Sequence, residues 1–203
     1  MKKINIIILM LITLPLFVVQ AQAAQSVKLF GVPLSTATRA KLEPVLIKAG
    51  FIPLSKYIHT VGAMTFDAVP LNPIELKGHL RYVGYRTTGQ LKGAHELAVG
   101  YTLSGRFAIA KYFIDSLYNS DVLAMLKDKY GKPGYIKALG PFKEHYEYIW
   151  NEEGGIKIVL KEEFFHTVLK IINVPECNIR LRQVKEEIKN SDKAVAKAEG
   201  GAF

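Results

Sequence analysis

Two short predicted helices, each ended by a glycine and each followed by segments typical of strands, constrain the fold of this chain most. The first helix lies within residues 38–50 and the second within residues 119–131. Gly50 and Gly131 are expected to end them, because glycine readily adopts the positive φ found just after a helix. Pro133 prevents the second helix from continuing. Helices combined with runs of antiparallel strands predict an α+β fold.

The starts of both helices are predicted from residues that can cap them. Ser35 or Thr36 is expected to cap the first helix and Asn119 or Ser120 the second, since side-chain oxygens can accept hydrogen bonds from the first free backbone N–H groups. Pro44 predicts either a kink in the first helix or a start later than Thr36. The second helix carries one apolar stripe, made of Val122, Leu123, Leu126 and Tyr130.

Runs rich in Val, Ile, Tyr and Phe predict an antiparallel sheet. The clearest hairpin joins residues 95–102 to residues 106–114 through Ser104 and Gly105. Both faces of its second arm are largely apolar, which indicates a central position in the sheet. The other expected strands are residues 27–32, 57–68, 79–85, 135–139, 144–150, 156–161 and 164–172.

The two helices align with each other. Placing Gly50 on Gly131 puts Leu42 on Leu123, and strands follow in both cases. This pattern predicts a tandem helix-plus-strands repeat within an α+β domain of residues 24–175, in which two short helices pack on the sheet. Chance similarity between two capped helices is the alternative. The corresponding halves would be residues 24–115 and 116–175.

The N-terminal 23 residues have the pattern of a secretory signal peptide. Lys2 and Lys3 precede an almost unbroken apolar run over residues 4–19, and the small residues Ala21 and Ala23 follow. We therefore expect cleavage after Ala23 and a periplasmic or secreted mature chain, with an uncleaved anchor as the alternative. No cysteine follows the run, so a bacterial lipid anchor is disfavoured.

The net charge and the single cysteine limit the kinds of binding partner and of disulfide that this chain can have. The formal charge of +9 falls to +7 when Lys2 and Lys3 are removed with the signal peptide. In an exported protein, this excess suits an acidic protein, an acidic glycan or a membrane surface better than nucleic acid, unless it serves solubility alone. Cys177 is the only cysteine, so no intrachain disulfide can form and a buried, inert thiol is expected. An intermolecular disulfide is the alternative.

Residues 176–203 are expected to form a basic C-terminal helix with a flexible tail. Its apolar stripe and its lysines, which recur every four residues, lie on different sides. The helix could dock on a membrane surface or an acidic partner, or it could lean on the domain by its apolar stripe. The stripe consists of Leu181, Val184, Ile188 and Val195, and the lysines are Lys185, Lys189, Lys193 and Lys197.

Tyr146, Tyr148 and Trp150 form a second candidate binding surface. They recur with period two, which places them on one face of a strand. Such an aromatic stripe can bind a peptide or a glycan, or it can form the core face beneath the helix that begins near Asp121.

Motifs for catalysis and for cofactors are absent from the sequence. It contains no G-x-S-x-G, H-E-x-x-H or Walker-type motif, and its five histidines are spread over separate predicted elements. His145 and Glu147 share a strand face, but a pair is too small for a metal site. We therefore assign no catalytic, cofactor-binding or metal-binding residue. The histidines are His59, His79, His95, His145 and His166.

The succession DVLAMLKDKYGKP, YEYIW and GIKIVL resembles the helix and strand unit of small exported bacterial envelope proteins. Two such units are similar to the tandem helix-plus-sheet architecture of the beta-lactamase inhibitor protein family and of small BamE-like envelope proteins. The segment SVKLFGVPL and the terminal Ala202 and Phe203 are similar to uncharacterised periplasmic proteins of Gram-negative bacteria. This resemblance implies a binding protein without catalytic residues, although the lipid-anchoring cysteine of BamE-like proteins is missing.

These observations favour an exported, non-enzymatic binding or accessory protein of the bacterial envelope. It is expected to recognise a protein or another envelope macromolecule through a sheet face or through the C-terminal helix, without a cofactor and without nucleic acid. The alternative is a small secreted hydrolase or metal-dependent enzyme whose site is assembled from dispersed His and Glu residues. The oligomeric state is left open.

Overall fold

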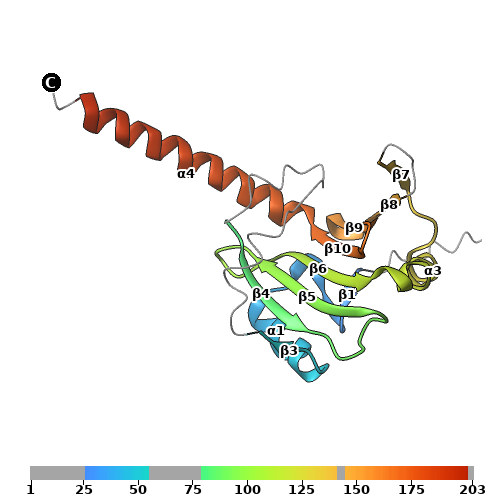
Figure 1. Ribbon diagram of the computed structural model, residues 1–203. Coiled ribbons are helices and arrows are strands. Elements are labelled where there is room, and N and C mark those ends of the chain that lie inside the picture. Colours follow the sequence, from blue (N-terminus) through green and yellow to red (C-terminus); the bar gives the residue numbers. More distant parts are fainter. Residues whose placement is uncertain (1–25, 55–78, 141–144, 201–203) are drawn as a thin grey trace, which may run out of the picture.

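The computed structural model describes residues 26–54, 79–140 and 145–200, with only the backbone for 196–200. The fold is α+β, as expected: an eight-stranded antiparallel sheet, a two-stranded sheet, short helices and a long C-terminal helix (Figure 1). The expected signal peptide and the expected strand 57–68 lie outside the described residues. No helix in the described part is long and apolar enough to cross a membrane.

The described elements follow one another along the chain, with residues 55–78, which lie between the third and fourth strands, outside the described part. They are β1 (Lys28–Leu29), β2 (Val32–Pro33), the 3-10 helix η1 (Leu34–Thr36), α1 (Arg39–Lys48), β3 (Ile52–Pro53), β4 (Arg81–Arg86), β5 (Ala94–Tyr101), β6 (Phe107–Asp115), the 3-10 helix η2 (Ser116–Tyr118), α3 (Asn119–Tyr130), β7 (Tyr135–Leu139), β8 (His145–Glu152), the 3-10 helix η3 (Glu153–Gly155), β9 (Ile156–Glu162), β10 (His166–Asn173) and α4 (Val174–Gly200).

The order of strands in the large sheet is symmetric. It runs β3-β4-β5-β6-β10-β9-β8-β7, and every neighbouring pair is antiparallel. One half consists of β3 to β6 and follows α1, whereas the other consists of β7 to β10 and follows α3. Within the described residues, one α-helix followed by four strands thus occurs twice, and the two sets of strands join where β6 pairs with β10.

Each face of the sheet buries a separate group of side chains. Helices α1 and α3 cover one face, where Leu42, Leu46 and Leu126 pack with aromatic residues of the strands (Figure 1). The beginning of α4 covers the other face, where Cys177 and Val184 pack against β6, β8, β9 and β10. Strand β6 is buried on both faces, as its sequence predicted, because successive side chains point to opposite sides.

The expected strand 27–32 is wrong. The segment forms the two-residue strands β1 and β2, with Leu29 paired to Val32. The reversal between them is made by Phe30 at φ 50° and Gly31 at φ 86°. Positive φ at both residues is the geometry of a tight hairpin turn, so one glycine in an apolar run converts a strand into a hairpin.

The predicted cap of the first helix is also wrong. Ser35 and Thr36 lie in or at the end of η1, and α1 begins at Arg39 after Thr38, whose side chain makes no capping bond. This later start is the one that Pro44 predicted as an alternative. The proline then lies in the second turn of the helix, where it removes a single backbone hydrogen bond.

Helix α3 has the expected end but a different beginning. Asn119 and Ser120 are inside the helix, not before it, and the Asn119 side-chain amide donates to Glu162. The asparagine therefore ties α3 to the end of β9 and does not cap the helix. At the other end Gly131 adopts φ 75° and its N–H donates to the carbonyl of Lys127 at 2.9 Å, as a helix-ending glycine should.

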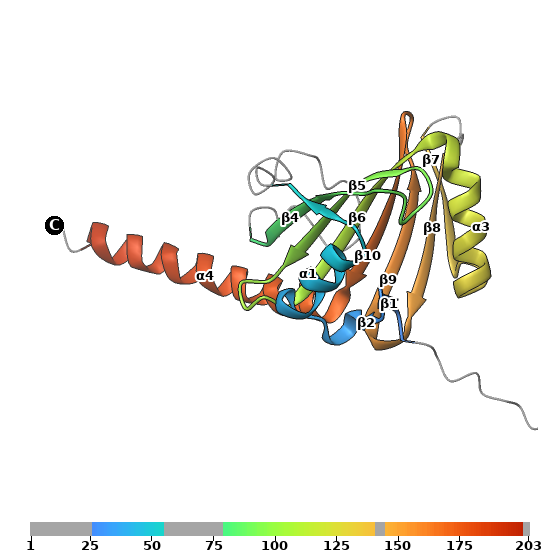
Figure 2. The same cartoon turned by 90° about the horizontal axis from the view of Figure 1, so that it is seen from below.

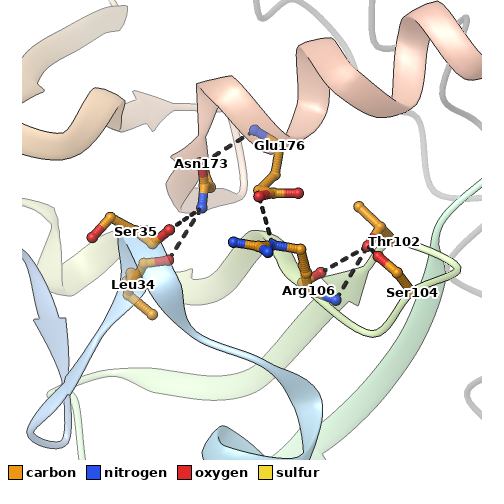
Figure 3. Close-up of polar contacts among 7 residues, drawn as sticks. All are labelled: Leu34, Ser35, Thr102, Ser104, Arg106, Asn173 and Glu176. Carbon is orange, nitrogen blue, oxygen red and sulfur yellow. Dashed lines mark hydrogen bonds and ion pairs between the residues drawn. The ribbon is translucent and has the colours of Figure 1, made fainter.

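Helix α4 is fixed to the domain at its base by polar contacts (Figure 3). The side chain of Asn173 accepts from the N–H of Glu176 at 3.3 Å and donates to the carbonyl of Leu34 at 3.2 Å. Glu176 also pairs with Arg106 at 2.7 Å. These contacts join α4, η1 and the β5–β6 turn at one place, so the direction in which α4 leaves the sheet is set by the fold.

Candidate functional site at the turn between β9 and β10

The predicted aromatic stripe is brought together, and its residues become more exposed from Trp150, which is buried, to Tyr148 and Tyr146. The ring centroids of Tyr146 and Tyr148 lie 6.1 Å apart, and those of Tyr148 and Trp150 lie 6.5 Å apart. Trp150 is buried, and its Nε1–H donates to the carbonyl of Gly131 at 2.9 Å, at the end of α3. Helix α3 therefore covers the stripe, which rules out Trp150 as part of an open platform and leaves Tyr146 as its exposed member.

The predicted lysine stripe lies on a nearly charge-balanced helix. Lys185, Lys189 and Lys193 are exposed on α4, and Lys197 lies further along its backbone. Residues 176–203 contain six Lys and Arg residues and five Asp and Glu residues. The segment therefore presents no strong excess of positive charge to an acidic partner.

The apolar stripe of α4 contacts the domain only at its base. Leu181 packs against the sheet and Val184 is buried, whereas Ile188 and Val195 are about half exposed. The expected packing of this stripe on the domain is therefore right for the first three turns and wrong beyond them. Figure 1 shows the remainder of α4 extending past the sheet.

The most exposed aromatic residues are found elsewhere, in the turn between β9 and β10. Strand β9 ends at Glu162 and β10 begins at His166, not at Phe164 as the sequence predicted. Phe164 is 73% exposed and Phe165 is 82% exposed. We call these two residues the aromatic tip. Figure 2 shows the β9–β10 turn projecting at the end of the sheet.

Glu163 holds this turn on one side. Its N–H donates to the carbonyl of His166 at 2.9 Å, and its carboxylate lies 3.1 Å from Lys161 Nζ and 2.7 Å from His166 Nε2. Burial alone would raise the pKa of Glu163, but the hydrogen bond from Lys161 and the charges of Lys161, His166 and Lys111 lower the pKa overall. The carboxylate therefore stays ionised and bonded to both neighbours.

Glu162 holds the turn on the other side. Its carboxylate accepts from the Asn119 amide and, at 2.9 Å, from the N–H of Tyr146. The pKa of Tyr148 is raised to about 12, mainly by burial and also by the charge of Glu162 and a hydrogen bond to it. Two adjacent glutamates thus tie the turn to β8 and α3 on one side and to β9 and β10 on the other.

The rings of the tip contact each other and one histidine. The centroids of Phe164 and Phe165 lie 5.1 Å apart at 69°, and the ring of His145 lies 5.8 Å from Phe164 at 68°. Edge-to-face ring pairs of this kind contribute about 0.5–1.5 kcal/mol beyond the area that they bury. The rings of the tip therefore have stabilising contacts of their own, although both phenylalanines are largely exposed.

A third exposed apolar side chain lies at the same end of the sheet. Asp115 at the end of β6 pairs with His166 at the start of β10, and Leu117 follows two residues later. Leu117 is 82% exposed, and its N–H donates to the Asp115 carboxylate at 3.0 Å. Among the residues that the structure describes, Leu117, Phe164 and Phe165 are the three most exposed large hydrophobic side chains.

Charged residues also gather on the sheet face that α4 partly covers. Lys111 lies opposite Lys170 in the pairing of β6 with β10, and Lys161 and Glu147 are on the same face. Lys111, Lys170 and Glu147 are all buried. Burial and, to a smaller extent, the charges of Lys111 and Lys161 lower the pKa of Lys170 to about 8. This amine is therefore less basic than an ordinary lysine.

The described histidines do not build a metal site. The rings of His95 and His166 lie 6.4 and 6.2 Å from the ring of Phe113. Within the described residues, no group of three or more His, Cys, Asp or Glu side chains is placed to hold a metal ion. His59 lies outside the described residues.

Cys177 is buried against β6. Its thiol lies 3.5 Å from the carbonyl of Ala108, and burial is the main reason why the pKa of this thiol rises to about 12. The buried position agrees with the expectation from the sequence, and the thiol stays protonated at neutral pH.

No protein-family model, curated protein or solved structure matches this chain. The geometry of the described residues is therefore the basis for a functional assignment.

Proposed function

We propose that this protein is an exported, non-enzymatic binding protein that recognises a protein partner through the aromatic tip. The observation that carries the proposal is that, in the part of the chain that the structure describes, the three most exposed large hydrophobic side chains lie at one end of the sheet: Leu117, Phe164 and Phe165. Export rests on the signal-peptide pattern of residues 1–23.

Folding does not account for the exposure of the two phenylalanines. Burying one such side chain is worth about 1.5–3 kcal/mol, so two exposed rings represent an interaction that the isolated chain does not make. Clusters of exposed apolar side chains commonly mark binding surfaces, and aromatic residues are frequent among those that dominate binding energy. The ordered turn reduces the entropy lost on binding.

The shape of the site favours a protein over a small molecule. A projecting turn can enter a pocket of another molecule, whereas small ligands are usually enclosed in concave sites. Asp115 and Glu162 place negative charge beside the tip, which disfavours insertion into a membrane rich in anionic lipids, whereas the charge of Glu163 is paired with Lys161 and His166. The partner surface is therefore expected to contain an apolar pocket.

A photo-crosslinking experiment tests this function. Benzoylphenylalanine replaces Phe165 in the mature chain, and a control chain carries the same group at Leu103, which is about half exposed in the β5–β6 turn. A partner that crosslinks from position 165 only is then purified and titrated. The Phe164→Ser and Phe165→Ser double variant should bind it at least tenfold more weakly, since truncated anchor residues commonly cost more than 1 kcal/mol each.

Three results would contradict the proposal. The two crosslinking positions could capture the same proteins, the double variant could bind the purified partner with unchanged affinity, or the tip could bind phosphatidylglycerol vesicles without any protein. The double variant should keep the thermal unfolding temperature of the parent chain, because neither ring belongs to the core.

A further inference from the structure

The two edges of the large sheet differ in a way that points to a second binding surface. Strand β3 forms one edge with only two residues, and one of them is Pro53, which has no N–H to donate. Strand β7 forms the other edge with five residues and contains no proline. No described strand pairs with the outer side of β7.

Strand β7 also exposes apolar side chains on both of its faces. Tyr135 lies opposite Ile149 and is 56% exposed, whereas Ile136 lies opposite Tyr148 and is 52% exposed. Successive strand residues point to opposite faces, so the edge offers one large apolar group on each side of its backbone. Unpaired backbone groups flanked by such side chains are a template for an added strand.

We propose that β7 accepts an extended segment of a partner protein as a ninth strand of the sheet. Backbone hydrogen bonds would supply the part of the affinity that does not depend on the peptide sequence, and contacts with the exposed side chains of Tyr135 and Ile136 would favour apolar side chains in the peptide. The proposal extends the proposed binding function, since His145 pairs with Leu139 at the end of β7 and contacts Phe164 of the tip. One partner can therefore reach both surfaces.

The charge of Lys137 indicates which kind of peptide segment would bind along β7. Lys137 lies at the centre of β7, opposite Glu147 of β8, and it is exposed. The two-fold register that pairs all five residues of β7 with a second copy would place Lys137 opposite Lys137, and like charges directly opposite are destabilising. A segment with Asp or Glu opposite Lys137, flanked by β-branched or aromatic residues, fits the edge better than another copy of this chain.

The test uses three synthetic peptides, each capped at both ends. The first is Val-Thr-Val-Glu-Val-Thr-Val, the second has Lys in place of Glu, and the third is the first with an N-methyl group on every backbone amide, so that neither of its edges can donate a hydrogen bond. Amide hydrogen exchange of the mature chain is followed at each residue. With the Glu peptide at saturation, exchange of outward-facing amides of β7 should slow at least tenfold, while exchange in β3 stays unchanged.

The variant Lys137→Glu makes the test specific. Opposite charges across a strand pair contribute about 0.2–1 kcal/mol, so the parent should prefer the Glu peptide over the Lys peptide by roughly two- to fivefold. The variant should reverse that preference, because its side chain then repels the Glu peptide. Binding of the N-methylated peptide should be lost in both chains.

Unchanged exchange in β7 or equal binding of the N-methylated peptide would overturn the proposal. So would a concentration-dependent dimer in which β7 itself becomes protected, since the occupant would then be a second copy. The tip variant Phe164→Ser with Phe165→Ser should bind the Glu peptide as the parent does. A negative result at β7 therefore does not contradict the proposed function of the aromatic tip. A negative result at the tip likewise does not contradict the proposal for β7.

Discussion

The β5–β6 and β9–β10 hairpins hold equivalent positions in the two halves of the sheet but use their turns differently. In the first, the carbonyl of Gly105 accepts from Arg39 at 2.7 Å, and Arg106 pairs with Glu176 at the base of α4 (Figure 3). In the second, Phe164 and Phe165 are largely exposed to solvent. The comparison shows that one hairpin turn contacts two helices, whereas the equivalent turn presents two exposed aromatic side chains.

The largest expected difference is between two phenylalanines, one from each hairpin. Phe107 directly follows the β5–β6 turn and is fully buried, whereas Phe165 is exposed in the β9–β10 turn. Phe107→Ala should lower the free energy of unfolding by about 3–5 kcal/mol, because it leaves a cavity in the core. Phe165→Ala should change it by less than about 0.5 kcal/mol. Urea unfolding of both variants measures the contrast, and equal losses would show that the tip belongs to the core.

A smaller effect is expected where the hairpins meet, at Lys111 and Lys170. Folding lowers the pKa of Lys170 from 10.5 to about 8, so the folded chain releases this proton at lower pH than the unfolded chain. Lys170 therefore lowers the free energy of unfolding by its full amount below pH 8, and by less as the pH rises towards 10.5, its pKa in the unfolded chain. Raising the pH from 7 to 9.5 should therefore add about 2 kcal/mol to the contribution of Lys170.

The variant Lys170→Met provides the control for this pH effect. Its stability should lack the increase between pH 7 and 9.5, while other groups contribute equally to both chains. The range ends below pH 10 because folding raises the pKa of several tyrosines, for example that of Tyr85 to about 12. Above pH 10 these tyrosines ionise in the unfolded chain but not in the folded chain, which lowers the free energy of unfolding. A parallel increase in both chains would contradict the assignment to Lys170.

The base of α4 gives the next comparison, between a side chain that joins separate segments and one that bonds within its own turn. Asn173→Ala removes the bonds to Glu176 and Leu34 and should cost about 1–2 kcal/mol, as expected for a lost helix cap. Ser104→Ala should cost less, since the side-chain hydrogen bond described for Ser104 is to Thr102 in the same turn. Chemical denaturation measures both, and equal costs would mean that the cap does not stabilise the helix.

Local sequence patterns predicted most elements. Period-two runs located β5 to β10 to within about two residues, because strands buried on at least one face need alternating apolar side chains. Gly131 marked the end of α3 because a positive φ there needs glycine. The turn at Phe30 and Gly31 was not predicted, because the apolar composition of residues 27–32 is typical of a single strand even with a two-residue turn inside it.

The candidate site depends on long-range contacts that sequence patterns do not contain. Strand β7 became an edge because the two sets of strands join through β6 and β10. The burial of Trp150 at the end of α3 was one of the two alternatives that the sequence left open, and the structure decides between them. Phe164 was assigned to a strand because its apolar character matched the following run. The expected strands 156–161 and 164–172 placed the reversal at Glu162 and Glu163, but the second strand begins at His166, so both phenylalanines belong to the turn and not to the strand.

The smallest expected effect concerns the order of the tip. Glu163→Gln removes the negative charge that faces Lys161 and His166, and it should lower the free energy of unfolding by less than about 1 kcal/mol, because the pairs are partly exposed. The pKa of Glu163 is lowered by folding, so its contribution is present at neutral pH and is lost as pH falls through the folded pKa. Fluorine NMR of 4-fluorophenylalanine at positions 164 and 165 should show narrower, averaged signals in the variant and in the parent chain at low pH. Spectra unchanged in both conditions would mean that ring contacts alone order the turn, and that the β9–β10 hairpin needs no ion pairs to present its aromatic tip.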